Sequence, residues 1–200
     1  MTQALIFAGF DLPPDREADI IAWHSEEHLP ERLALPGFRR GRRYRSSTAA
    51  PKYLVLYELE ALCVMESPAY LERLNNPTPW TSRSVSQFQN NFRSCFEILS
   101  RRGRSRGGFV TFLALPEGAE RVALEAGAGR VTFARCDIGR SSIHTTEAEA
   151  IRNRVMTGDI VLIEADSREE LGRLSRPYLV SAEDEPPVYE LDHLLEAIEA

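Results

Sequence analysis

The pattern of hydrophobic and polar positions divides the first half of the chain into six elements. Short apolar runs bounded by Pro and Gly favour strands, and prolines followed by acidic residues are typical of a helix start. The expected elements are a strand at 4–12, a helix at 13–35, strands at 37–48 and 52–60, a helix at 67–76 and a strand around 92–99. Their order is β-α-β-β-α-β.

The second half repeats this order less clearly, after a polar, glycine-rich linker at 101–108. Its expected elements are a strand at 107–117, a helix at 118–128, strands at 129–138 and 159–167, a helix at 168–179 and a last strand or mixed element at 187–198. Residues 139–157 fit no position of the repeat. We interpret them as a long loop or an inserted helix.

Two units of this order predict an α+β protein of two ferredoxin-like repeats, residues 1–102 and 103–200. A four-stranded antiparallel sheet with both helices on one face leaves its other face bare, and a bare apolar face needs a partner. We therefore expect the two antiparallel sheets to pack face to face within one chain, as smaller proteins achieve by dimerising. A further homodimer is then optional.

Composition agrees with an ordinary globular protein. The chain has 200 residues, of which 43% are hydrophobic and 27% charged. Its apolar runs are too short to cross a membrane, and the first twelve residues lack the basic start of a secretory signal. The three cysteines are widely separated, without a CxxC spacing, which favours buried thiols over disulfides or a zinc site. These features predict a cytoplasmic protein that does not engage membranes.

The helix at 13–35 carries two histidines, His24 and His28, four residues apart and therefore within one helical turn of each other. Pro30 predicts a kink that turns His28 toward the space between helix and sheet. On an ideal helix, Ile20 and Glu27 are expected to face solvent, with both histidines on the flank of the buried stripe. That stripe is expected to comprise Ala18, Ile21, Ala22, Ser25, Leu29 and Leu33. The alternative is that both histidines only decorate a solvated helix end.

The stretch WHSEEHLPERLALPGFRRGRRY, residues 23–44, resembles the W-x4-H-x-P helix and following strand of the dimeric α+β barrel superfamily, which includes muconolactone-isomerase-like and EthD-like proteins. The resemblance is clearest over residues 4–100. It implies a pocket between sheet and helices for small or polycyclic organic molecules, commonly without a metal or organic cofactor. It points to His28, with Trp23 and His24 beside it. Members include isomerases, oxygenases, haem-binding enzymes and proteins without demonstrated activity.

Two tyrosines and a tryptophan are candidate substrate-binding residues. A tyrosine hydroxyl beside a histidine can donate to a carbonyl or enolate oxygen while the histidine moves a proton, and Tyr44 and Tyr57 are the candidates. Trp80 lies in a proline-punctuated loop that could cover a pocket mouth. For all three residues the alternative is simple packing.

Arginine clusters raise a competing function, RNA binding. Residues 38–45 contain five arginines, and RGGFVTF at 106–112 is one residue short of an RNP1-like pattern. Three features count against it: the near-match falls on the first strand of its repeat, the second half is net acidic, and alternate arginines would face the inter-sheet core. They could pair there with glutamates of the first helix. We therefore do not expect a nucleic-acid partner.

Metal ligation is not indicated, because His144 and His193 are isolated and no HxH or HExxH spacing occurs. A haem role would need an axial histidine facing a large pocket. The sequence thus predicts a small-molecule pocket protein without cofactor, an isomerase, lyase or oxygenase-type enzyme acting on an aromatic or lactone-like metabolite, with His28 and His24 moving protons. The alternative class is a non-catalytic binding or interaction module whose histidines are structural.

Overall fold

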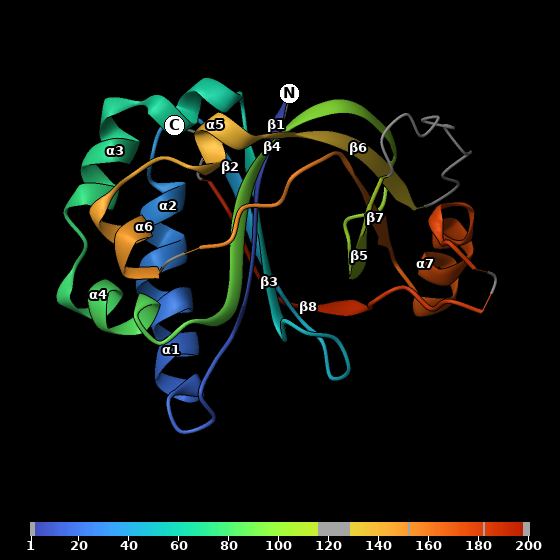
Figure 1. The fold of residues 1–200 in the computed structure, drawn as a ribbon, viewed down its shortest axis with the longest axis horizontal. Coiled ribbons are helices and arrows are strands. Elements are labelled where there is room, and N and C mark those ends of the chain that lie inside the picture. The colour runs from blue at the N-terminus through green and yellow to red at the C-terminus, as the bar shows by residue number, and fades with distance from the viewer. Residues whose placement is uncertain (1–2, 116–128, 152, 182, 198–200) are drawn as a thin grey trace.

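The computed structural model describes residues 3–115, 129–151, 153–181 and 183–197. Within them, eight antiparallel strands close into one barrel (Figure 1). The strands are β1 (Ala4–Asp11), β2 (Phe38–Arg45), β3 (Tyr53–Leu59), β4 (Gln89–Gly103), β5 (Phe109–Ala114), β6 (Arg130–Asp137), β7 (Ile160–Ala165) and β8 (Tyr189–Glu196). The fold is an α+β barrel.

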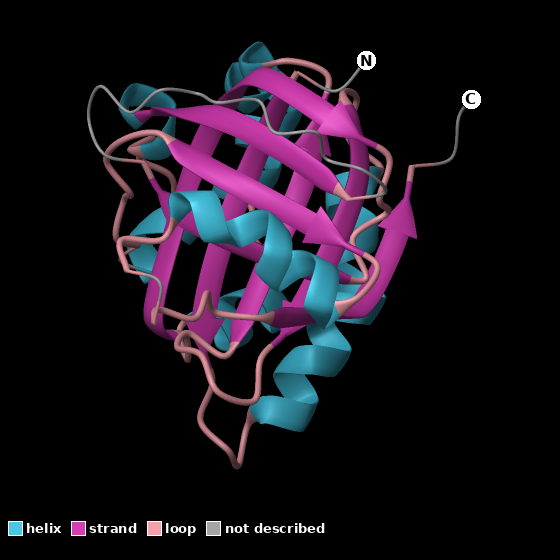
Figure 2. Cartoon of the chain, turned by 90° about the vertical axis from the view of Figure 1, so that its right-hand side faces the viewer, coloured by secondary structure: helices cyan, strands magenta, loops and turns pink. Residues whose placement is uncertain are grey.

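Helical segments cover two opposite sides of the barrel, with α1, α2, α3, α4 and α6 on one side and α7 on the other (Figures 1 and 2). They are α1 (Glu17–Trp23), the π-helical η1 (His24–His28), α2 (Leu29–Leu33), η2 (Leu62–Glu66), α3 (Pro68–Asn75), α4 (Pro79–Val85), α5 (Ile138–Ser141), α6 (Thr146–Ile151), α7 (Arg168–Ser175) and η3 (Arg176–Tyr178). No helix in the described ranges is long and apolar enough to cross a membrane.

The strands follow the order β1-β3-β2-β8-β5-β7-β6-β4 around the barrel. The expectation of two facing sheets needs one correction, because their edges are also hydrogen-bonded to each other. β2 pairs with β8, and β4 pairs with β6. Closure satisfies the backbone N–H and C=O groups that two separate sheets would leave unpaired at their edges.

β1 and β3 are buried on both faces, which explains their nearly continuous apolar runs. In β3, Tyr53, Val55 and Tyr57 pack under the helices of the first half. Leu54 and Leu56, on the alternate face, pack inside the barrel with side chains from the second half. The described part of the molecule therefore has an apolar core inside the barrel, a second between the barrel and the helices of the first half, and a third between β6, β7 and α7.

Buried ion pairs cross the interior of the barrel. Arg42 is fully buried, and its guanidinium group donates to Glu164 Oε1 at 2.5 Å, Glu58 Oε1 at 2.7 Å and Tyr44 Oη at 2.8 Å. An arginine of the 38–45 cluster thus faces the core, as predicted. Its partners come from β3 and β7 rather than from the first helix, because β2 turns this side chain away from that helix.

One connecting region differs from the sequence prediction, since the expected linker at 101–108 begins inside β4, which continues to Gly103 because its backbone pairs with β6. Residues 139–157, expected to form a long loop or an inserted helix, contain the end of α5 and all of α6. The helix expected at 118–128 lies outside the described residues.

Replacing Arg42 with Met should lower the free energy of unfolding by about 3–5 kcal/mol, because the buried Glu164 loses its nearest cation and keeps the more distant Arg130, at 3.7 Å. Urea unfolding of the purified variant measures the loss. Combining Arg42→Met with Glu164→Leu should recover most of it, since the buried carboxylate is then removed as well. Arg39→Met, which breaks an exposed pair with Glu60, is the control and should change stability by less than about 1 kcal/mol. Equal losses for the two single variants would contradict the role of Arg42.

Candidate functional site

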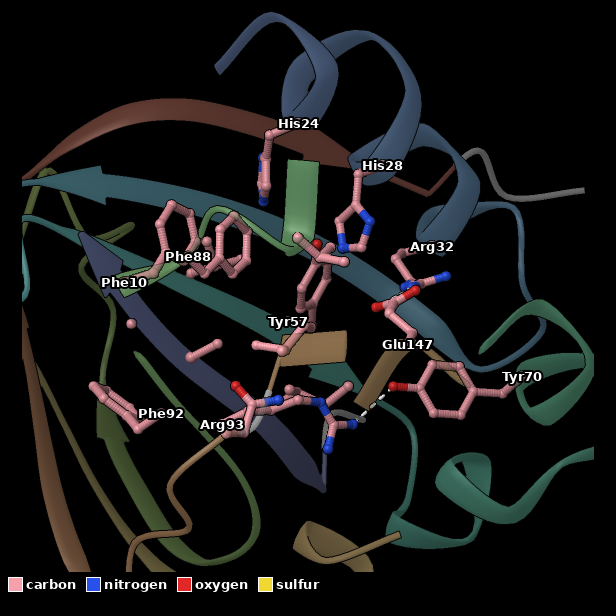
Figure 3. Close-up of a pocket in the computed structure, with 17 residues that line it drawn as sticks. Phe10, His24, His28, Arg32, Tyr57, Tyr70, Phe88, Phe92, Arg93 and Glu147 are labelled. Carbon is pink, nitrogen blue, oxygen red and sulfur yellow. Dashed lines mark hydrogen bonds and ion pairs between the residues drawn. The ribbon is translucent and has the colours of Figure 1, made fainter. Parts of the chain in front are cut away.

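A cavity of about 60 Å³ lies between the outer face of the first-half strands and the helices that cover it. β1, β3 and β4 form its floor, and η1, α2, α3, α4 and α6 surround it. Apolar side chains such as Ile6, Phe10 and Val55 line much of its wall. Figure 3 shows His24 and His28 projecting from one side toward Tyr57, with Arg93 on the opposite side. The cavity therefore lies where the resemblance placed a pocket, outside the barrel itself.

The first helix is broken at the histidines. The N–H of Leu29 bonds to the carbonyl of His24, five residues back, so residues 24–28 form a widened π turn. Pro30, in the first turn of α2, has no N–H with which to continue a regular ladder. The helix thus restarts close to the predicted kink.

The predicted buried stripe was wrong in phase. Ile20 and Trp23 are almost completely buried, whereas Ala18 is exposed. The prediction assumed one regular helix from 13 to 35. The π turn rotates α1 relative to α2, so the buried side that holds for Leu29 and Leu33 does not hold for the residues before the turn. The bulky apolar residues of α1 face the sheet instead, and His24 and His28 follow on the same side.

His24 is buried and held by Arg43. Arg43 Nη1 lies 3.1 Å from His24 Nδ1 and 3.0 Å from Ser25 Oγ. Because a guanidinium group can only donate, Nδ1 of His24 accepts and its proton sits on Nε2. Burial, reinforced by the charge of Arg43, lowers the pKa of His24 well below its usual 6.5. His24 is thus a neutral hydrogen-bond donor beside the cavity at pH 7.

His28 combines a supported ring with an unpaired nitrogen. Its ring packs on Trp23, with centroids 4.6 Å apart, and lies 5.4 Å from the ring of His24. Its Nδ1 is buried and has no hydrogen-bond partner among the described residues. Burial, followed by the nearby charge of Arg32, lowers its pKa well below 6.5. The two effects together make this histidine neutral and only weakly basic.

Two further buried donors, both on residues that line the cavity, lack partners within the described part of the chain: Tyr57 Oη and Arg32 Nη1. Burial raises the pKa of Tyr57, so its hydroxyl stays protonated. Arg32 Nη2 donates to both carboxylate oxygens of Glu147, at 2.6 and 2.8 Å, which leaves Nη1 free. The cavity therefore joins a neutral base to two donors suited to a carbonyl or enolate oxygen.

The other predicted site residues lie elsewhere. Trp23 is fully buried behind His28, and its indole N–H donates to Glu27 and Thr81, so it supports the histidine rather than lining the cavity. Trp80 packs on the outer core without lining the cavity. Tyr44 lies inside the barrel, because its position on β2 faces Arg42 and the interior.

Five polar cavity residues were missed by the sequence analysis: Arg32, Tyr70, Arg93, Glu147 and Asn153. Arg93 left at most a weak signal: it lies between Phe92 and the buried Ser94 and Cys95, where a charged side chain has to find a partner or a polar space. Glu147 left no sequence signal, because its contact with Arg32 depends on how the 139–157 segment packs against the helices of the first half.

The site does not fit a metal or a haem. In the described residues, no three His, Cys, Asp or Glu side chains come together as ligands. An axial histidine would have to face a slot as wide as a tetrapyrrole, whereas both histidines face a cavity of about 60 Å³. The Nδ1 atom of His24 is in addition occupied by Arg43. No step is therefore assigned to either group.

Comparison with known proteins identifies the fold. No protein-family model and no curated protein matches the chain. An anthrone oxidase-like protein of known structure is similar at a TM-score of 0.60 and 13% identity, over 99% of this chain and 94% of its own. A candidate monooxygenase from Fusobacterium nucleatum is similar at a TM-score of 0.55 and 11% identity, over 98% of this chain and 94% of its own. A mutant chlorite dismutase from Candidatus Nitrospira defluvii is similar at a TM-score of 0.51 and 9% identity, over 95% of this chain and 91% of its own. These likenesses show the fold alone.

The free energy of unfolding should fall as the pH drops below about 6.5, the ordinary pKa of histidine. The reason is that the folded protein resists protonation of His24 and the unfolded chain does not. The folded pKa is lowered, so the contribution is fully present above 6.5 and is lost toward acid. Each such histidine adds a slope of up to about 1.4 kcal/mol per pH unit. Urea unfolding between pH 7.5 and 5.5 measures it.

In His24→Gln the free energy of unfolding should change less steeply with pH, by up to about 1.4 kcal/mol per pH unit, which corresponds to one proton fewer taken up on unfolding. His144→Gln removes an exposed histidine and should leave the slope unchanged. A slope in His24→Gln equal to that of the unmodified protein would show that His24 is not held neutral.

Proposed function

We propose that the chain is a cofactor-independent enzyme that removes a proton from an activated carbon of an aromatic or lactone-like metabolite, with His28 as the base. The observation that carries the proposal is the cavity in which His28 Nδ1, Tyr57 Oη and Arg32 Nη1 are buried together, each without a hydrogen-bond partner among the described residues. Unpaired buried polar atoms are rare in folded proteins, and at one cavity they favour a ligand.

Each group has a distinct role. With its proton on Nε2, His28 presents a lone pair on Nδ1 that accepts the proton from the substrate C–H bond. The electron pair of that bond moves onto the neighbouring carbonyl oxygen. The resulting oxyanion is held by the hydroxyl of Tyr57 and by the guanidinium group of Arg32. His24, anchored by Arg43, supports the same wall of the cavity and contributes less.

Two fates of the enolate are chemically balanced. In an isomerase the proton returns to another carbon and no other reactant is needed. In an oxygenase, molecular oxygen is the second substrate: a CH₂ group becomes C=O with one oxygen atom, and the other leaves as water with the two hydrogens. We favour the oxygenase, because structures similar to this fold include an anthrone oxidase-like protein and a candidate monooxygenase.

Cavity size restricts how a substrate binds. About 60 Å³ holds a few waters or the reacting edge of a ring. A second cavity of about 20 Å³ adjoins it past Tyr70, Arg93 and Glu147, under α6. A polycyclic substrate therefore has to displace side chains between the two cavities or extend through the opening of the larger one.

A non-catalytic small-molecule-binding module is the second candidate. The anchoring of His24 by Arg43 and Ser25 favours it, since this histidine has a structural role that needs no reaction. RNA binding is not proposed. Arg42 and Arg43 are buried and paired with carboxylates, so they form no basic surface.

We also infer that the barrel consists of two ferredoxin-like repeats, residues 1–102 and 103–200. Support comes from strand order, because β4-β1-β3-β2 and β8-β5-β7-β6 run through corresponding strands in the same sequence. An EthD-like or muconolactone-isomerase-like relationship, a homodimer and a cytoplasmic location stay predictions.

Oxygen uptake with anthrone as the probe substrate tests the proposal. His28→Gln should lower kcat/KM by about 10²–10⁴-fold, the usual contribution of general base catalysis. Tyr57→Phe should lower it by about 10²-fold through loss of an oxyanion donor. The acidic limb of the pH profile should lie below 6.5, because burial lowers the pKa of His28.

His144→Gln is the matched control and should keep full activity, since this histidine is exposed and does not line the cavity. Anaerobic exchange of the activated protons of anthrone in D₂O isolates the proton-transfer step from the reaction with oxygen. Activity that survives in His28→Gln would remove this residue from the mechanism. Tight binding of the probe without exchange or oxygen uptake would favour the non-catalytic module.

A further inference from the structure

The charges that line the cavity do not balance. Arg32, Arg93 and Glu147 are the charged members of its lining, because His24 and His28 are held neutral. Glu147 forms a buried ion pair with Arg32 at 2.6 Å, in which one guanidinium nitrogen contacts both carboxylate oxygens. One positive charge, that of Arg93, is left over.

Arg93 has a hydrogen-bond partner but no counter-ion. Its Nη2 donates to the hydroxyl of Tyr70 at 2.7 Å (Figure 3). Burial raises the pKa of Tyr70, so that hydroxyl is neutral at pH 7. No carboxylate among the described residues forms an ion pair with Arg93. Glu147 also lines the cavity, but its charge is already offset by Arg32. A partly buried guanidinium group without a counter-ion is unfavourable unless an anion binds it.

We propose that the ligand of this cavity carries a carboxylate group that binds Arg93, at the end opposite the histidines. The inference rests on the proposed function only in using the same cavity. A guanidinium fork matches a carboxylate with two parallel hydrogen bonds. Tyr70, on α3, fixes one arm of the fork, so the group is oriented before the ligand arrives.

The arrangement also orients the substrate. Figure 3 shows His28 and Arg93 on opposite sides of the cavity with Tyr57 between them. A carboxylate held by Arg93 would therefore direct the other end of the molecule toward Tyr57 and His28. The preferred substrate class is an aromatic or lactone-like carboxylic acid rather than a neutral ring.

NMR titration of the ¹⁵N-labelled protein tests the proposal with matched pairs of small probes. Benzoate is compared with benzamide, and propionate, which suits the small cavity, with propionamide. Each amide keeps the size of its carboxylate and removes the charge. The carboxylates should bind at least about tenfold more tightly, since a hydrogen bond to a charged group is commonly worth that factor. Shifts should centre on β4 and α3.

Three variants locate the effect. Arg93→Gln should abolish the preference for carboxylates without changing the affinity for amides, and Arg93→Lys should keep part of it. Arg83→Gln makes the same charge change on the exposed face of α4 and should leave the preference intact. The comparison of carboxylate with amide in the unmodified protein, at low and high salt, stands even if an Arg93 variant does not fold.

Equal affinities for carboxylates and amides in the unmodified protein, or a preference that survives in folded Arg93→Gln, would overturn the inference. His28→Gln separates it from the proposed function. This variant should bind benzoate like the unmodified protein, because the base does not contact the anion. If His28→Gln loses oxygen uptake but binds benzoate unchanged, both proposals are supported. If it keeps oxygen uptake and still binds benzoate more tightly than benzamide, only the anion site is retained.

Discussion

The guanidinium group of Arg42 holds the two halves of the barrel together from inside. It joins Glu58 on the neighbouring strand to Glu164 on β7 of the second half, and both carboxylates are buried. It also donates to the carbonyl of Arg106, where the chain passes into the second half. The adjoining Gly107 has a φ of +76°, and a side chain there would meet Arg42 and Glu164. Since these groups and aromatic side chains fill the interior, the ligand cavity has to lie outside the barrel.

Space outside the barrel depends on how closely the first helix approaches the sheet. Gly41 on β2 allows this approach, because a Cβ atom there would lie 2.9 Å from Leu29 Cδ1. α2 is thereby fixed against the sheet at one end of η1, and Trp23 is buried at the other end. Between these two fixed points the widened turn presents His24 and His28 to the cavity. A regular helix would carry Leu29 away from the sheet and would lose this arrangement.

Local patterns in the sequence predicted the four strands, the first helix and α3 of the first half and the histidine pair, because these depend on residues close in the chain. They missed α4, which was expected to be a loop carrying Trp80. Closure of the barrel was not predictable, since the pairing of β2 with β8 joins residues about 150 positions apart. The separation of Tyr44 from Tyr57 has the same origin. Each strand was read correctly, but only the register between β2 and β3 and the position of the helices decide which tyrosine faces the cavity. Arg93 gave only a weak sequence signal, because the strand around it mixes polar and apolar residues.

The electrostatics of the cavity restrict its chemistry. Burial and the charge of Arg32 keep His28 neutral, which makes it available as a base but also weak, because an imidazolium ion beside a guanidinium group is unfavourable. A weak base can abstract a proton only from a carbon whose anion is strongly stabilised. That stabilisation has two sources here: conjugation within an aromatic or vinylogous substrate, and the donors Tyr57 and Arg32 at the developing oxyanion. In the proposed reaction, the positive charge that weakens the base would also stabilise the anion that the base forms, so we expect the site to favour acidic carbon acids over simple ketones.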